Sequence, residues 1–111
     1  MISIMESLCK IELCGYIGNA TINSVGNSKL ARFSLATEHA YKSQDGTCCI
    51  DMTWFNCSCW MSDTIKCLDK IQKGKVAHLT GRVRMSRYTD ATGSERQIWE
   101  VVCQTLEIFE P

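Results

Sequence analysis

The chain has 111 residues, of which 45% are hydrophobic and 22% charged, and its formal net charge is zero. This size suits a single domain spanning residues 1–111, and no apolar run approaches the roughly 20 residues that cross a bilayer, which excludes a membrane-spanning helix. The N-terminus has neither a basic start nor a small-residue cleavage site, so we expect a cytoplasmic protein.

The first part of the chain predicts two strands joined by a polar connection. Residues 8–18 mix β-formers with alternation and end at glycines, which predicts a strand with a bulge or sharp bend at Gly15 or Gly18. Residues 19–28 are rich in Asn, Ser and Gly and predict a connection. Apolar and polar residues then alternate over 31–41, which predicts the second strand.

A turn at 43–46, Ser-Gln-Asp-Gly, precedes a third strand over 48–60. Side chains alternate between the two sides of a strand, so one side of this strand carries both indoles among polar groups. These residues are Trp54, Asn56, Ser58 and Trp60, whereas Phe55, Cys57 and Cys59 occupy the opposite, apolar side. Indoles outside a core indicate a surface for planar rings, of which nucleobases are the obvious candidates.

One stretch has helical spacing. After Ser62 or Asp63 as an N-cap, Ile65, Leu68 and Ile71 recur every three residues, which predicts a short helix before a fourth strand. The fourth strand covers 77–88, with Gly81 on its apolar side, where a barrel strand can bend. A turn at 90–93 and a fifth strand at 96–108 follow. We expect Trp99 of the fifth strand to lie in the core or at an interface. Five strands with a helix between the third and fourth predict an all-β OB fold, a Greek-key barrel whose sheet face and loops bind oligonucleotides.

The polar side of the fourth strand lines up the guanidiniums of Arg82 and Arg84 with the phenol of Tyr88. Residues 66–87 hold seven basic residues and one acid, and residues 88–111 hold five acids and one arginine, so the charge is unevenly distributed. A local positive field attracts phosphate even when the total is neutral. Singly, Trp54 could fill the core, Tyr88 could cap the barrel and the arginines could be solvated; together they predict a groove for single-stranded nucleic acid.

The eight cysteines are expected to be free thiols, with Cys57 and Cys59 acting as small buried hydrophobes. The Cys57-x-Cys59 spacing and the isolated His39 and His78 do not suit zinc. The chain shows no phosphate-loop or dinucleotide fingerprint and no recognisable acid, base and nucleophile set. We therefore expect no enzyme, no metal and no cofactor.

Several motifs in a fixed order resemble bacterial single-stranded DNA-binding proteins (SSB) over about residues 8–108. They are Leu-Cys-Gly-Tyr-Ile-Gly at 13–18, Ala-Arg-Phe-Ser-Leu-Ala-Thr at 31–37, Thr-Trp-Phe-Asn at 53–56, Lys-Gly at 73–74, Leu-Thr-Gly-Arg-Val-Arg at 79–84, and Tyr-Thr-Asp at 88–90 followed by Gly93. The resemblance implies an OB fold that binds single-stranded DNA and assembles as a homotetramer through its first strands.

The resemblance also implies roles for individual residues. Base-stacking positions are matched by Tyr41, Trp54, Trp60 and Tyr88, and basic positions near the DNA path by Lys73, Arg84 and Arg87. Phe55 and Asn56 replace the usual His and Arg, which leaves open a subunit contact at the first and a phosphate contact at the second. The sequence ends at Pro111 without the linker and acidic tip through which the family recruits enzymes, so tail-mediated recruitment is not expected.

Three functions remain open on the sequence. The first is sequence-nonspecific binding that protects and organises single-stranded DNA in replication, recombination and repair. The second is a tail-less primosomal-type adaptor, dimeric, acting in replication restart. The third is an OB module whose tryptophans grip a sugar or a proline-rich peptide.

Overall fold

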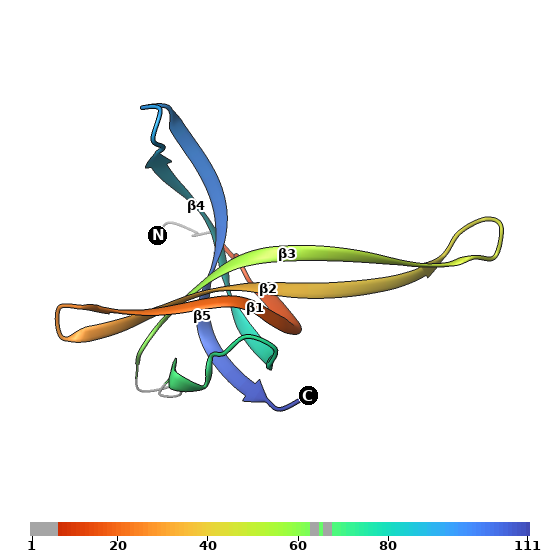
Figure 1. Ribbon diagram of the computed structural model, residues 1–111, viewed down its shortest axis with the longest axis horizontal. Helices are drawn as coiled ribbons and strands as arrows, with labels where there is room; N and C mark the ends of the chain where they lie inside the picture. Colours follow the sequence, from red (N-terminus) through yellow and green to blue (C-terminus); the bar gives the residue numbers. More distant parts are fainter. Residues whose placement is uncertain (1–6, 63–64, 66–67) are drawn as a thin grey trace, which may run out of the picture.

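The computed structural model describes residues 7–62, 65 and 68–111, and five strands form a closed barrel in the order β1-β2-β3-β5-β4 (Figure 1). The strands are β1 (Ile11–Val25), β2 (Ser28–Lys42), β3 (Cys48–Trp60), β4 (Val76–Thr89) and β5 (Glu95–Phe109). All neighbours pair antiparallel except β3 and β5, which are parallel. This is the five-stranded Greek-key barrel of the OB fold, and the fold prediction is confirmed.

The connection predicted at 19–28 is wrong, because β1 continues to Val25 and only Gly26 and Asn27 separate it from β2. The register shifts between Ile17 and Ala20, so the predicted irregularity at Gly18 is a bulge inside one long strand. The polar residues beyond it are exposed yet pair along β2, which satisfies their backbone groups. Residues of a solvent-exposed hairpin and of a loop are both polar because both face water. The composition of 19–28 therefore does not distinguish the two.

The predicted bend at Gly81 coincides with the register shift between β4 and β5. A Cβ at this position would lie 2.1 Å from the carbonyl oxygen of Val102, so only glycine lets the two strands approach this closely.

Among the described residues between β3 and β4, helical structure is confined to one 3₁₀ turn, η1 (Leu68–Lys70). The candidate N-cap Asp63 lies outside the described residues, whereas the Oγ of Ser62 accepts a hydrogen bond of 3.1 Å from the backbone N–H of Ile65. Ile65, Leu68 and Ile71 are all buried in the core. Their three-residue spacing therefore marks the side chains that close one end of the barrel.

The core follows the predicted alternation of the strands. Its buried residues from the strands are Leu13, Ile17, Ala31, Phe33, Leu35, Cys57, Cys59, Ala77, Leu79, Val101, Cys103 and Leu106. Ser58 is also buried, although it shares the polar side of β3 with the tryptophans. Trp99 is 61% exposed, so the alternative that it lies in the core is wrong, and its place at an interface stays a prediction.

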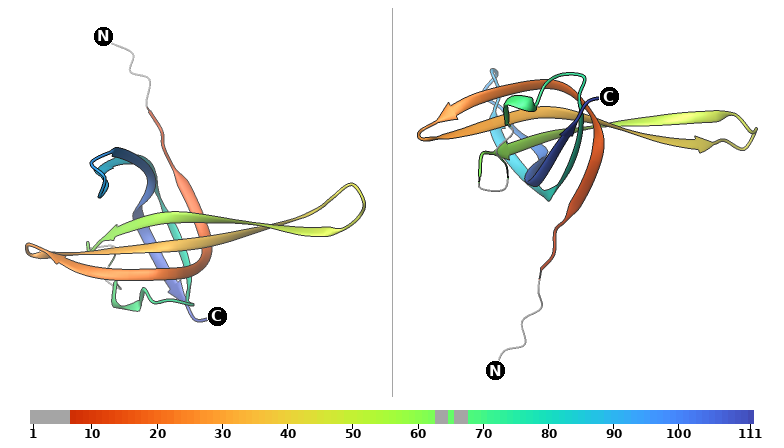
Figure 2. Two further views of the ribbon diagram at one scale, coloured as in Figure 1. Left: turned by 45° about the horizontal axis from the view of Figure 1, so that its top comes forward. Right: turned by 90° about the horizontal axis from the view of Figure 1, so that it is seen from below.

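The β2–β3 and β4–β5 hairpins project from the barrel as arms (Figures 1 and 2). The β2–β3 arm ends at the turn of residues 43–47 and the β4–β5 arm at the turn of residues 90–94. Strands β3 and β5 pair only at Cys57–Val101 and Ser58–Val102, so the two arms diverge beyond these pairs. We call the space between residues 54–56 of β3 and residues 97–100 of β5 the fork. Among the described residues, no helix has the length and apolar character to traverse a bilayer.

Candidate nucleic-acid interface

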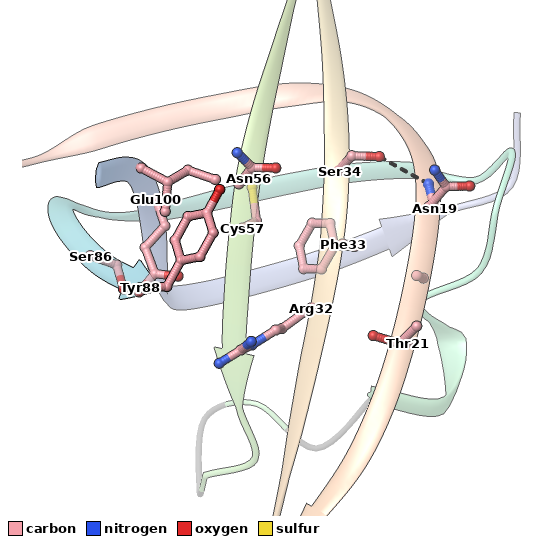
Figure 3. Close-up of a pocket in the computed structure, with 12 residues that line it drawn as sticks. Asn19, Thr21, Arg32, Phe33, Ser34, Asn56, Cys57, Ser86, Tyr88 and Glu100 are labelled. Atoms are coloured by element: carbon pink, nitrogen blue, oxygen red, sulfur yellow. Dashed lines mark hydrogen bonds between the residues drawn. The ribbon is translucent and has the colours of Figure 1, made fainter. Parts of the chain in front are cut away.

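A groove of about 460 Å³ lies on the barrel where β1, β2 and β3 meet the β4–β5 arm (Figure 3). Its apolar lining comes from Ala20, Phe33, Cys57 and Ile98, and its polar lining from Asn19, Thr21, Arg32, Ser34, Asn56, Ser86, Tyr88 and Glu100. We call it the polar groove. Apolar surface with a few convergent polar groups is the usual character of a ligand site.

The β1 bulge shapes one side of this groove. It places the backbone N–H of Asn19 2.9 Å from the Oγ of Ser34, which accepts its hydrogen bond (Figure 3). Within the described part of the chain, the side-chain amides of Asn19 and Asn56 have no hydrogen-bond partner. Each amide offers donors and an acceptor, so both can bind a ligand in the groove.

Arg32 and Tyr88 bring a charge and a ring to the same groove (Figure 3). Tyr88 is 51% exposed. Arg32 takes part in none of the ion pairs found among the described residues, so its guanidinium is available to an anion. The groove can therefore stack a planar ring, form hydrogen bonds with its edge and bind a phosphate.

Trp54 and Trp60 both point out of the barrel, as the alternation of β3 predicts. Their exposed fractions are 56% and 42%, so the alternative that Trp54 fills the core is wrong. The Trp54 ring reaches across β2 to β1, where it covers Gly18. Across β2, Ser34 pairs with Asn56 and Ala36 with Trp54, which places the indole beside the polar groove.

The other predicted site residues are spread over the surface. Tyr41 is 43% exposed and lies on the β2–β3 arm, opposite Cys49. Lys73 is exposed between η1 and β4, and Arg82 is exposed on β4. None of these three lines the polar groove.

Two of the predicted arginines are engaged by acids. The Nε of Arg84 lies 3.1 Å from Oε1 of Glu100, and Arg87 lies 3.8 Å from Glu95. Glu100 is the more buried partner of Arg84, with a side chain 19% exposed. The carboxylate that lines the polar groove is thus neutralised in place, which limits its repulsion of an anionic ligand.

The turn of the β4–β5 arm is organised by Asp90. Its carboxylate accepts hydrogen bonds from Arg96 Nε at 2.8 Å, from both the hydroxyl and the backbone N–H of Thr92, and from the backbone N–H of Ser94. The Arg96 guanidinium and then the Thr92 hydroxyl lower the pKa of Asp90 from 3.8 to about 2. This network fixes the arm close to Tyr88.

Arg32, Ser34 and Asn19 are functional candidates that the sequence reasoning did not select. Arg32 and Ser34 have the outward parity of their strand and pair with Ser58 and Asn56 of β3, so parity could have found them. Nothing in the sequence indicates that Asn19 lies beside them, because the β1 bulge creates that contact. Among the described residues, no group of three or more His, Cys, Asp or Glu side chains could hold a metal ion.

Comparisons with known proteins give one family. The family model described as "Single-strand binding protein family" matches residues 8–109. Single-stranded DNA-binding protein 1 of Streptococcus pyogenes is 30% identical over 80 residues, covering 72% of this chain and 60% of that protein. Single-stranded DNA-binding protein 2 of Listeria monocytogenes is 29% identical over 82 residues, covering 74% and 50%. The chain thus spans about half to three-fifths of these relatives.

Two solved structures share the fold. A structure described as a Plasmodium falciparum SSB complex with ssDNA superposes with a TM-score of 0.79 at 22% identity, covering 96% of this chain and 97% of that one. The single-stranded DNA binding protein from Thermus aquaticus, as a deletion mutant, superposes with a TM-score of 0.75 at 14% identity, covering 93% and 51%.

Proposed function

The chain belongs to the single-strand binding protein family, and from this premise we propose that it binds single-stranded DNA without sequence preference. The observation that carries the proposal is the polar groove, in which Tyr88, Arg32 and the side-chain amides of Asn19 and Asn56 converge beside the exposed indole of Trp54. Stacking contributes ~1–3 kcal/mol per base and is sequence-tolerant, because every base has a π-face.

In this proposal, the bound single-stranded DNA follows the outward-facing side of β3. At ~3.3 Å per residue, Trp54 and Trp60 are about 20 Å apart and engage separate nucleotides. Tyr41 extends the path onto the β2–β3 arm, and Tyr88 provides the stacking platform on the β4–β5 arm. Phosphates are bound by the basic residues around this path, which are Arg32, Lys73, Arg82, Arg84 and Arg87.

In the cell, this binding protects and organises single strands during replication, recombination and repair. The assembly is a homotetramer in which segments at the start of β1 pair between subunits. Leu8, 86% exposed just before β1, supports this arrangement because an apolar side chain there gains from being covered.

A dimeric adaptor in replication restart is the second candidate. It is favoured by the engagement of Arg84 and Arg87 with Glu100 and Glu95, which leaves less free positive charge for phosphates. An adaptor of this kind binds DNA weakly and acts mainly through proteins.

Titration with oligo-dT while tryptophan emission is recorded tests the proposal, with light scattering in the same buffer. A DNA binder shows strong quenching, an adaptor shows weak or partial quenching, and a sugar- or peptide-binding module shows none. Duplex DNA of equal length is the control. Trp54→Ala and Trp60→Ala should each weaken binding to dT and dC oligomers by similar factors, and a loss confined to one base type contradicts stacking as the mechanism.

A further inference from the structure

Trp99 is a large apolar side chain that the barrel leaves uncovered. It lies on the β4–β5 arm opposite Met85 and is 61% exposed, slightly more than Trp54. Trp99 has the same strand parity as the buried Val101, but it stands beyond the end of the β3–β5 pairing. The side of β5 that faces the core at Val101 therefore faces the fork at Trp99.

A second groove, of about 400 Å³, occupies the fork. We call it the fork groove. Its lining is mainly apolar and includes one indole from each arm, Trp54 from β3 and Trp99 from β5. Phe55, Val83, Ile98 and Val101 complete the apolar lining, and Asn56, Gln97 and Glu100 are the polar groups.

The fork groove adjoins the polar groove. Asn56, Ile98 and Glu100 line both, so the two grooves are neighbours that meet at these three residues. A DNA strand with one base stacked on Tyr88 in the polar groove can pass these shared residues. It can then place a neighbouring base in the fork.

The chemistry of the fork groove fits a base and disfavours a phosphate. No lysine or arginine lines it, and its one charged group is the Glu100 carboxylate, which is paired with Arg84. Indoles stack on any nucleobase, whatever the DNA sequence. We propose that the fork groove holds one base of the bound DNA strand, with Trp99 as a stacking residue additional to Trp54. This inference rests on the proposed function.

The test compares Trp99→Ala with Phe109→Ala for binding to an oligo-dT long enough to cover the barrel. Phe109 is a matched control because it is an exposed aromatic on the same strand, 47% exposed, that lines neither groove. Loss of one stacked base predicts about 5- to 150-fold weaker binding for Trp99→Ala. Trp99→Phe should recover most of the affinity, and Phe109→Ala should bind like the parent protein.

Cross-linking locates the base directly. An oligo-dT with 5-iodouracil at single positions, irradiated on the parent protein, should yield Trp99-containing peptides by mass spectrometry. Equal affinity of Trp99→Ala and the parent, or the absence of this cross-link, overturns the inference while leaving the proposed function intact. A change of oligomeric state in Trp99→Ala with unchanged affinity assigns the fork groove to a second copy and also overturns it. Failure of the parent protein to bind oligo-dT overturns the proposed function itself.

Discussion

The indole of Trp54 lies over Gly18, so close that a Cβ at residue 18 would come within 2.6 Å of the indole Cζ3 atom. The two residues belong to β3 and β1, and the ring crosses β2 to make this contact. The same Cβ would also lie 2.6 Å from the Oγ of Ser34, the atom that accepts the hydrogen bond from Asn19. The missing side chain therefore determines both where the indole lies and how the polar groove is shaped.

Gly18→Ala should displace the Trp54 ring and weaken binding to oligo-dT, because the indole can no longer lie flat on β1. We expect a loss approaching that of Trp54→Ala, about 5- to 150-fold, with a shifted tryptophan emission maximum in the free protein. Gly26→Asn is the matched control: a Cβ at Gly26 meets nothing within 4 Å, and Asn tolerates its positive φ of 59°. Unchanged emission and affinity in Gly18→Ala would refute this account of the groove.

The sequence predicts the barrel well because apolar and polar residues alternate over most of its strands. The alternation of β3 places Cys57 and Cys59 inside and Trp54 and Trp60 outside, as found. Alternation fails at Trp99, because a core-facing side of a strand becomes exposed where the strand leaves the barrel. The second half of β1 is likewise not predicted, because a solvent-exposed hairpin and a loop contain the same polar residues.

The candidate site is less predictable than the fold, because it depends on how strands far apart in the chain meet. The positive charge of residues 66–87 draws attention to β4, yet Arg84 and Arg87 are paired with acids from β5. Arg32 is a single arginine in a segment without a charge cluster, and it lines the polar groove. Ion pairs of this kind are set by cross-strand register, which local sequence does not reveal.

Arg32→Gln should lower the salt dependence of DNA binding. An unpaired guanidinium that neutralises one phosphate releases about one counterion, so the slope of log K against log salt should fall by about 0.7. Lys29→Gln removes the same charge from β2 at a residue that lines neither groove, and should leave the slope nearly unchanged. Equal slopes for the parent and Arg32→Gln would remove Arg32 from the phosphate path.

Acid should loosen the β4–β5 turn through Asp90. Its pKa is lowered from 3.8 to about 2 in the folded protein, chiefly by Arg96 and then by Thr92. The ionised carboxylate thus stabilises the turn above about pH 4, and this contribution is lost as the pH falls from 4 towards 2. The protection of the amides of residues 90–94 against exchange, measured relative to the intrinsic rate at each pH, should fall over that range.

Asp90→Asn should show the same loosening at neutral pH and reduce the contribution of Tyr88 to binding. Asp45→Asn is the paired control, because Asp45 organises the β2–β3 turn in a similar way, with a pKa lowered to about 2 by hydrogen bonds from Ser43 and Thr47. That variant should leave exchange at 90–94 unaltered. Protection at 90–94 that is independent of pH would assign the order of this turn to its backbone alone.

Thiol chemistry should divide the cysteines by burial. Burial, with a smaller effect of Cys59, raises the pKa of Cys57 to about 12, and the hydrogen bond with Cys59 together with burial raises that of Cys103. The reactive species is the thiolate, so neither thiol should react with iodoacetamide at pH 8 in the folded protein. Cys9, Cys14 and Cys48 are exposed and should be alkylated under the same conditions.

Site-resolved mass spectrometry of alkylated peptides measures this division, with labelling in urea as the control in which every thiol reacts. Raising the pH from 8 to 10 should accelerate the exposed sites and leave Cys57 nearly inert, because its thiolate forms only as the pH approaches 12. Cys57 belongs to the two-pair seam between β3 and β5, where it pairs with Val101. Alkylation of Cys57 at the rate of Cys14 would contradict this division, because it would show that the buried thiol is reached in the folded protein, either from the polar groove that it lines or by separation of β3 and β5.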